Sequence, residues 1–365
     1  MKRVVQLAAV TAAAALVLSA CGDAPEDDAT AGASGSAGAA SDFKACMVSD
    51  SGGFDDKSFN ESGFNGLNAA KEALGIEITT QESQAESDFA PNIDNLISEN
   101  CNIVVTVGYL LATATGDAGQ ANPDVEFAIV DSTAADADGA PIELPNVKPL
   151  SFNTSEAAYL AGYVAAGMTT TGTVATFGGM QIPTVSIFMD GFVDGVAKYN
   201  EDNGTDVQAL GWNKEAQNGS FTGDFEDQSK GQQLTQTFID QGADIIMPVA
   251  GPVGSGALAA ASDAEGVSVI WVDSDGALQQ PEYADVILTS VLKDISVAVE
   301  DVITAASESA FSPDAYVGTL ENGGVDIAEF HEFDADVPQE LKDKVDELRE
   351  SIINGTIVVE SPSAP

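Results

Sequence analysis

Positive charge is scarce in this sequence. Its 365 residues contain 13 Lys and Arg against 58 Asp and Glu, so the formal net charge is −45 at pH 7. Nucleic acids are bound chiefly through lysine and arginine contacts to phosphates, so we exclude nucleic acid as a partner. A field of this sign also disfavours anionic ligands, and we expect most of the carboxylates to lie on a solvated surface.

Histidine and cysteine are also rare. The single histidine, His331, lies far in the sequence from a plausible nucleophile, so a serine or cysteine catalytic triad has no base. The sequence has neither a His and Cys cluster for zinc nor an EF-hand pattern. Residues 251–256 are rich in glycine, but no Lys-Ser or Lys-Thr follows to reach a nucleotide. We therefore expect no metal and no cofactor, and we reject ATP hydrolysis.

Long apolar runs are missing except at the N-terminus. Met1-Lys2-Arg3 is basic, residues 4–17 are apolar, and Leu18-Ser19-Ala20-Cys21 follows. The run is too short for a spanning helix. It resembles a bacterial lipobox, in which cleavage leaves Cys21 as a lipidated N-terminus, and an ordinary secretory signal is the alternative. We expect a signal peptide at 1–20, a flexible Ala, Gly and Ser tether at 21–41, and a lipid-anchored protein on the extracytoplasmic face of the cell membrane.

The other two cysteines are Cys46 and Cys101, each near the start of a predicted strand. Disulfides persist outside the cytoplasm, and two neighbouring parallel strands would bring these residues together. Two buried thiols are an equally good interpretation, because the sequence does not give the Cα separation that a disulfide needs.

Short β-rich runs alternate with helix-length segments, which is typical of parallel sheets with crossover helices. A first series predicts strands at 43–48, 76–80, 103–107, 126–130 and 147–152, with helices at 58–74, 88–99, 109–121 and 154–168. A second series predicts strands at 173–177, 206–210, 245–248, 267–272 and 286–289, with helices at 183–203, 228–241 and 254–265.

Two such series predict an α/β protein with two lobes. We assign 42–152 and about 277–315 to lobe 1, and 153–276 and about 316–360 to lobe 2. Residues 316–330 suggest a hairpin around Asn322-Gly323-Gly324. After Pro338, apolar residues three and four apart predict a helix with one buried face.

Open α/β sheets bind ligands beyond the carboxyl ends of their strands, so two facing sheets form a cleft. Asp50 to Asn60 follows the first predicted strand and contains a glycine turn, a carboxylate and the ring of Phe59. Ser58 or Asp56 is suited to cap the next helix. A tight turn over a buried phenylalanine is the plainer interpretation of the same residues.

This segment resembles the basic membrane protein family, the purine nucleoside receptors of bacteria. The family pattern is matched at Asp50, Gly52, Gly53, Asp56, Ser58, Phe59 and Asn60. The likeness continues through most of the chain, including residues 127–131, 156–162, 190–192, 223–225, 271–275 and 288–293. It implies a periplasmic-binding-protein-like fold of type I, in which each lobe is a parallel sheet flanked by helices and a ligand cleft lies between the lobes.

The resemblance also implies the binding residues. A purine would stack between Phe59 and a second ring, Phe225, with Trp212 and Phe221 as alternatives for that ring. Asp50 and Asp131 would meet the base, Gly251, Asp273 and Lys293 would meet the ribose hydroxyls, and Asn60 is a further ligand-binding residue. Two features depart from the family: Pro252 removes an amide that would otherwise donate to the ribose, and residues 212–222 are longer than expected.

The function that this resemblance implies is that of a substrate-binding protein for an ABC importer. It would not be an enzyme; its partners would be a purine nucleoside and membrane permease subunits. A sugar or autoinducer receptor of the same fold, a sensor for a signalling receptor, and a nucleoside-processing enzyme using two carboxylates remain as alternatives.

Overall fold

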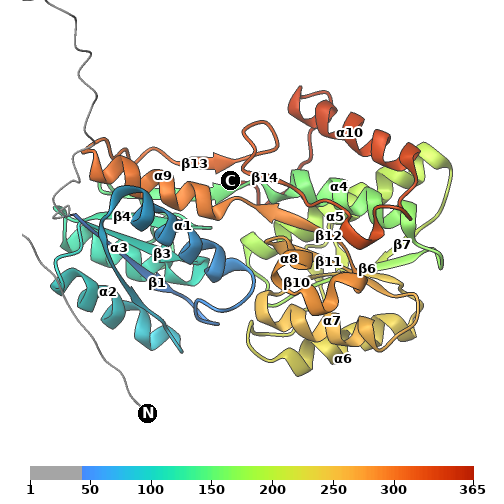
Figure 1. Cartoon of the computed structure of the whole chain (residues 1–365), viewed down its shortest axis with the longest axis horizontal. Helices are drawn as coiled ribbons and strands as arrows, with labels where there is room; N and C mark the ends of the chain where they lie inside the picture. Colours follow the sequence, from blue (N-terminus) through green and yellow to red (C-terminus); the bar gives the residue numbers. More distant parts are fainter. Residues whose placement is uncertain (1–42) are drawn as a thin grey trace, which may run out of the picture. The chain divides into compact units, whose positions relative to one another are not determined.

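The computed structural model describes residues 43–365, in which the strands form two six-stranded sheets and one two-stranded ribbon. The predicted signal peptide at 1–20, the tether at 21–41 and Cys21 lie outside the described residues. The predicted α/β fold with two parallel-dominated sheets flanked by helices is confirmed (Figure 1).

The first sheet contains only parallel pairs, in the order β13-β5-β4-β3-β1-β2. Its central strand β3 is a run of β-branched residues that are all buried, as expected for a parallel sheet covered on both faces. Helices α1 and α9 pack on one face, and α2 and α3 pack on the other. The elements of this lobe are β1 (Lys44–Ser49), α1 (Phe59–Leu74), β2 (Glu77–Gln81), α2 (Phe89–Ser98), β3 (Ile103–Val107), α3 (Ala112–Ala121), β4 (Glu126–Val130), β5 (Val147–Phe152), α9 (Ile295–Ser307) and β13 (Tyr316–Gly318).

A disulfide joins Cys46 of β1 to Cys101, two residues before the start of β3, with Cα atoms 5.9 Å apart. Both residues are buried in the cluster that lies beneath α2 and α3. The bond links two neighbouring strands across a sequence separation of 55 residues. The structure thus adopts the first of the two alternatives that the sequence left open.

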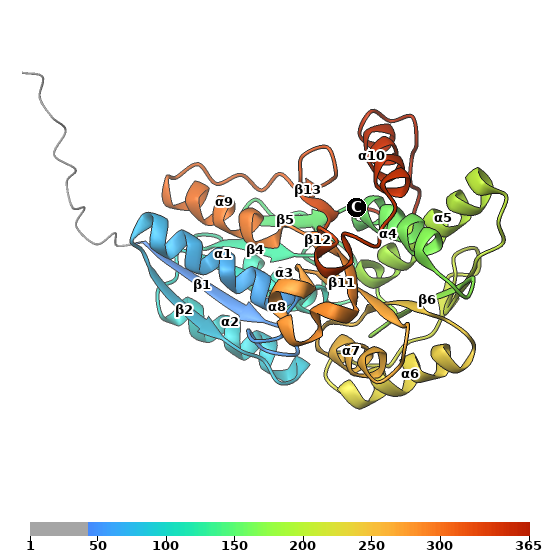
Figure 2. The same ribbon diagram turned by 45° about the vertical axis from the view of Figure 1, so that its right-hand side comes forward.

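The second sheet has the order β14-β12-β11-β10-β6-β7, and β14 is its antiparallel edge. Helices α4 and α5 pack together on one face, and α6 and α7 cover the other (Figure 2). The elements of this lobe are α4 (Thr154–Met168), β6 (Thr173–Gly178), α5 (Pro183–Asn203), β7 (Gln208–Leu210), α6 (Gln228–Asp240), β10 (Ile245–Val249), α7 (Gly254–Ser262), β11 (Ser268–Asp273), α8 (Gly276–Gln279), β12 (Ile287–Lys293), β14 (Val325–Ile327) and α10 (Gln339–Ile353), with the ribbon β8 (Trp212–Asn213) and β9 (Asn218–Gly219).

The chain passes between the two sheets where β5 leads into α4, where β12 leads into α9, and where β13 leads into β14. These connections are hydrogen-bonded to one another: the Asn153 amide donates to the Gly318 carbonyl, and the Asp294 amide donates to the Gly324 carbonyl. The Leu320 amide donates to Glu156 at 2.8 Å. The three connections therefore form one continuous hinge region.

The strand pairing corrects two details of the sequence-based division. Strand β12, placed in lobe 1 with residues 277–315, belongs to the second sheet, whereas β13, placed in lobe 2 with residues 316–360, belongs to the first. The predicted hairpin at 316–330 is also wrong, because β13 pairs with β5 and β14 pairs with β12. The turn at Gly323, where φ is 73°, does not join two paired strands of one sheet. It connects a strand of the first lobe to a strand of the second.

The carboxyl ends of the central strands in both sheets point toward the space between the lobes, and the residues that follow them include Asp50, Tyr109, Asp131, Gly251 and Asp273 at the end of β11. Within residues 43–365, no helix is both long enough and apolar enough to cross a bilayer.

Candidate ligand-binding site

A pocket between the lobes contains all eight residues that the sequence predicted for ligand binding. It holds about 540 Å³ of empty space, part of it open to solvent. The first lobe provides Asp50, Phe59, Asn60 and Asp131, and the second provides Phe225, Gly251, Asp273 and Lys293.

The turn after β1 is fixed by Asp56, which caps α1. Its buried carboxylate accepts the backbone N–H groups of Ser58, Asn60 and Glu61 at 2.9 to 3.0 Å. Burial outweighs these hydrogen bonds and raises the pKa of Asp56 to about 6. Of the two capping candidates, Asp56 therefore takes this role, and the Ser58 hydroxyl instead donates to Asp273 of the other lobe at 3.0 Å.

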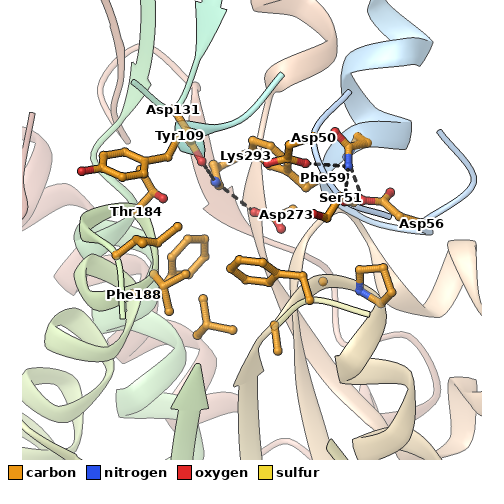
Figure 3. Close-up of a pocket in the computed structure, with 18 residues that line it drawn as sticks. Asp50, Ser51, Asp56, Phe59, Tyr109, Asp131, Thr184, Phe188, Asp273 and Lys293 are labelled. Carbon is orange, nitrogen blue, oxygen red and sulfur yellow. Dashed lines mark hydrogen bonds and ion pairs between the residues drawn. The ribbon is translucent and has the colours of Figure 1, made fainter. Parts of the chain in front are cut away.

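Asp50, which Figure 3 shows at one end of the pocket, forms a polar pair with Asn60. The Asn60 side-chain amide donates to Asp50 Oδ1 and to the Ser51 carbonyl, both at 3.1 Å. Its own oxygen is buried and has no partner within residues 43–365. A Cβ atom at Gly108 would lie 1.9 Å from Asp50 Oδ2, so only glycine fits beside this carboxylate. Burial raises the pKa of Asp50 to about 8, with the nearby Asp56 and Asp131 contributing in the same direction.

Lys293 lies at the centre of the pocket and pairs with a carboxylate from each lobe. Its Nζ forms an ion pair with Asp131 and lies 3.1 Å from Asp273 Oδ1. Its side chain is only 3% exposed. Burial alone would lower the pKa of Lys293, but Asp131 and Asp273 more than reverse this and raise it. Burial also raises the pKa of Asp131, although Lys293 acts in the opposite direction.

Asp131 and Asp273 occupy equivalent places in the two lobes. Asp131 follows β4 and Asp273 ends β11, and both have left-handed backbones, with φ of 60° and 69°. Aspartate is one of the few non-glycine residues that adopt this conformation, which occurs preferentially at functional sites. In both residues that have this backbone conformation, the carboxylate points toward Lys293 (Figure 3).

Aromatic rings from both lobes line the pocket. Phe59 begins α1, and the Lys293 nitrogen lies 4.8 Å from its ring centroid. Phe225 lies against Gly179, where an added Cβ atom would approach the ring to 2.4 Å. Trp212 and Phe221, the alternatives for the second ring, pack edge to face on each other and do not line this pocket.

Sequence reasoning missed Phe188, Tyr109 and Thr184, which also line the pocket. Phe188 is buried on α5 and its ring centroid lies 5.1 Å from the Lys293 nitrogen. It stands in a helix that is apolar on several sides, so periodicity does not separate it from core residues. Tyr109 lies two residues beyond β3, and the rule that ligands bind after strands would have found it.

His331 lies outside the pocket, and its Nε2 is 2.7 Å from Asp275 Oδ2. It is only partly exposed rather than a free surface side chain. Among residues 43–365, no group of three or more His, Cys, Asp or Glu side chains is arranged to hold a metal ion.

Two parallel-sheet lobes around a cleft of aromatic and carboxylate side chains define a two-lobed solute-binding protein. The model of the Bmp family, described as ABC transporter substrate-binding protein PnrA-like, matches residues 43–363. The chain therefore belongs to this family of ABC transporter substrate-binding proteins, which is not a family of enzymes, and the resemblance noted from the sequence is confirmed.

Individual relatives agree with this assignment. The chain is 31% identical over 379 residues to the ABC transporter nucleoside-binding protein BmpA of Lactococcus lactis subsp. cremoris, with 99% of each chain covered. It is 30% identical over 313 residues to basic membrane protein A of Borreliella burgdorferi, covering 85% of this chain and 86% of the relative. A solved ABC transporter solute-binding protein from Aeropyrum pernix K1 superposes with a TM-score of 0.76 at 25% identity, covering 88% of this chain and 94% of that one.

Proposed function

We propose that this protein binds purine nucleosides in the cleft and delivers them to ABC permease subunits. The observation that carries the proposal is that Phe59 and Phe225, from opposite lobes, line one pocket with four aspartates. Stacking of a base on an aromatic side chain contributes about 1–3 kcal/mol and needs a flat apolar face. The nucleoside-binding relative from Lactococcus lactis supports the same ligand class.

The polar groups divide by position. Asp50 and Asn60 provide an acceptor and an amide at one end, which suits the hydrogen-bonding edge of a base. The unpartnered Asn60 oxygen is a further acceptor there. Asp273, Gly251 and Lys293 would meet the ribose hydroxyls, and Asp131 lies beyond Lys293 on the side away from Asp50. Pro252 has no backbone N–H, so the segment beside Gly251 has one hydrogen-bond donor fewer to offer the ribose.

The charges favour a neutral ligand. Asp50, Asp56, Asp131 and Asp273 line the pocket, and Lys293 is its one cationic side chain among the residues that the structure describes. Because the pKa of Asp50 is raised to about 8, that carboxyl holds its proton at pH 7 and adds no charge there. A phosphate would face uncompensated carboxylates in a buried site, whereas nucleoside N–H and O–H groups can donate to them. Nucleosides are therefore favoured over nucleotides.

Closure of the lobes provides the mechanism. Ser58 to Asp273 and Lys293 to Asp131 are contacts between the lobes at the pocket. A ligand that binds both walls stabilises the closed arrangement over the open one, and the permease would recognise the closed form. We propose further that Cys21 carries the lipid that anchors the protein at the extracytoplasmic membrane surface.

The ligand is tested by extracting the purified protein with solvent and identifying small molecules by mass spectrometry, followed by calorimetry with adenosine, guanosine and inosine. We expect a purine nucleoside in the extract and binding of at least one of the three. Absence of binding by all three, with sugars bound instead, would contradict the proposal.

The stacking contact is tested with Phe225→Ala, with Phe221→Ala as the matched control. Both rings lie against the Gly178-Gly179 turn, but Phe225 alone of the two lines the pocket. We expect Phe225→Ala to weaken nucleoside binding about tenfold or more and Phe221→Ala to change it less than threefold. Incubation of the nucleoside with the protein also tests the enzyme alternative, because a receptor returns its ligand unchanged.

A further inference from the structure

A second pocket continues the cleft beyond Lys293. It encloses about 560 Å³ of empty space, part of it open to solvent, and shares Tyr109, Asp131, Thr184 and Lys293 with the first pocket. Figure 3 shows Tyr109, Asp131 and Thr184 on the side of Lys293 that lies away from Asp50. Of the eight residues predicted for ligand binding, only Asp131 and Lys293 border this second pocket.

Several hydroxyl groups line its walls. Ser132, Ser151, Thr154 and Thr184 come from four separate segments at the junction of the lobes. The charged side chains that line it, Asp131 and Lys293, are already paired with each other. A neutral group with several hydroxyls is therefore the chemistry that matches these walls, since each hydroxyl can both donate and accept.

Thr154 gives independent evidence for a missing partner. It is the first residue of α4 and only 1% exposed, and its hydroxyl is buried without a hydrogen-bond partner in the described residues. An unpartnered buried hydroxyl is costly, and such groups in native proteins are usually satisfied by a ligand or an ordered water. Ser151 and Thr184 also lack side-chain partners within residues 43–365.

We infer that this second pocket is a subsite for a neutral, hydroxyl-bearing substituent on the sugar of a bound nucleoside. The inference rests on the proposed function, in which Lys293 contacts the ribose. Because Lys293 borders both pockets, a group attached to the sugar on that side enters the second pocket without moving the base. The protein would then accept sugar-substituted nucleosides as well as the parent compounds.

The ligand series that tests this uses adenosine, guanosine and inosine with their 5′-O-(2,3-dihydroxypropyl) and 5′-O-butyl ethers and their 5′-monophosphates, measured by calorimetry. We expect the dihydroxypropyl ether of the best-bound nucleoside to bind within threefold of its parent or more tightly. The butyl ether, which offers no hydrogen bonds, should bind at least tenfold more weakly than the dihydroxypropyl ether. The monophosphate should bind more weakly still.

Thr154→Val removes the unpartnered hydroxyl while keeping the side-chain shape, and Thr235→Val is its matched control. Thr235 on α6 also has a buried hydroxyl without a partner, but it lines neither pocket. We expect Thr154→Val to weaken binding of the dihydroxypropyl ether about three- to tenfold, as for one hydrogen bond, and to leave the parent nucleoside unchanged. Thr235→Val should change neither affinity.

The outcomes separate the two proposals. Tight binding of a parent nucleoside with rejection of its dihydroxypropyl ether would overturn the subsite alone. Stronger binding of the monophosphate than of the dihydroxypropyl ether would also overturn it, in favour of an anion site. Failure of every parent nucleoside and every derivative would overturn the proposed function and the subsite together.

Discussion

The two walls of the cleft are built in different ways. The wall from the first lobe takes Asp50, Phe59 and Asn60 from one short segment, in which Asn60 holds Asp50. The wall from the second lobe takes Phe188 from α5, Phe225 from the loop before α6, and Lys293 from β12. Local hydrogen bonds therefore shape the first wall, whereas the second wall depends on the packing of a whole lobe.

This difference between the two walls predicts which of them is more rigid. The first lobe is also crosslinked by the Cys46–Cys101 disulfide beneath its outer helices, while Lys293, which belongs to the second sheet, lies between carboxylates of both walls. We expect the first wall to be preformed and the second to adjust. Lys293 couples the two walls through its ion pairs with a carboxylate from each.

Lys293→Met should have the largest effect, because it leaves Asp131 and Asp273 buried without their cation. Breaking one side of a buried ion pair costs about 3–5 kcal/mol, so we expect a loss of that order in the free energy of unfolding, measured with urea. Adding Asp131→Asn and Asp273→Asn to the same chain should restore most of the stability. A loss below about 1 kcal/mol for Lys293→Met alone would show that the walls are not coupled through this residue.

Cys46→Ala together with Cys101→Ala should lower the free energy of unfolding by about 2–4 kcal/mol, as is typical for a native disulfide that closes a loop of this size. Nucleoside affinity should change little, because neither sulfur lines the cleft. Reduction of the unmutated protein with thiol should have the same effect on stability. If affinity fell more than tenfold, the first wall would depend on the disulfide rather than on its local hydrogen bonds.

Phe59→Ala should weaken nucleoside binding about tenfold or more, the loss of one stacking contact. The ring is only partly buried, so the free energy of unfolding should fall much less than for a core phenylalanine. Calorimetry and urea unfolding of the same preparation separate the two effects. Unchanged affinity would remove Phe59 from the binding site.

The effect of Asp50→Asn on stability should depend on pH. Since the pKa of Asp50 is raised to about 8 from an ordinary 3.8, the folded protein holds a proton between these values that the unfolded chain has lost. The contribution of Asp50 to the free energy of unfolding therefore falls as pH rises from about 4 to about 8. Unfolding measured at pH 5, 6, 7 and 8 should show a smaller decline in Asp50→Asn than in the unmutated protein. Identical slopes would contradict the raised pKa.

Much of the fold follows from local sequence patterns. The strands at 103–107, 126–130 and 147–152 and the helices at 154–168 and 183–203 have the bounds that the alternation of apolar runs predicts. What local patterns do not contain is the partner of each strand. For this reason the sequence-based division places β12 and β13 in the wrong lobes, and the glycine turn that joins the lobes has the sequence pattern of a hairpin.

Some residues of the candidate site also follow from local sequence patterns, whereas others do not. The residues after β1 and Asp131 after β4 could be predicted because they occupy the strand ends where α/β sheets bind ligands. Phe188 could not, because a ring that faces a cleft from an apolar helix has the same sequence signature as a core ring. The second pocket also escaped prediction, since single serine and threonine residues carry no pattern until the lobes bring them together.

The three connections between the lobes hold each other through the Asn153–Gly318 and Asp294–Gly324 hydrogen bonds. Linked in this way, they cannot bend independently, so the lobes should swing about one axis without shearing past each other. The angle between the lobes would then depend on ligand occupancy alone, and a membrane partner could distinguish the bound form from the free form by this angle.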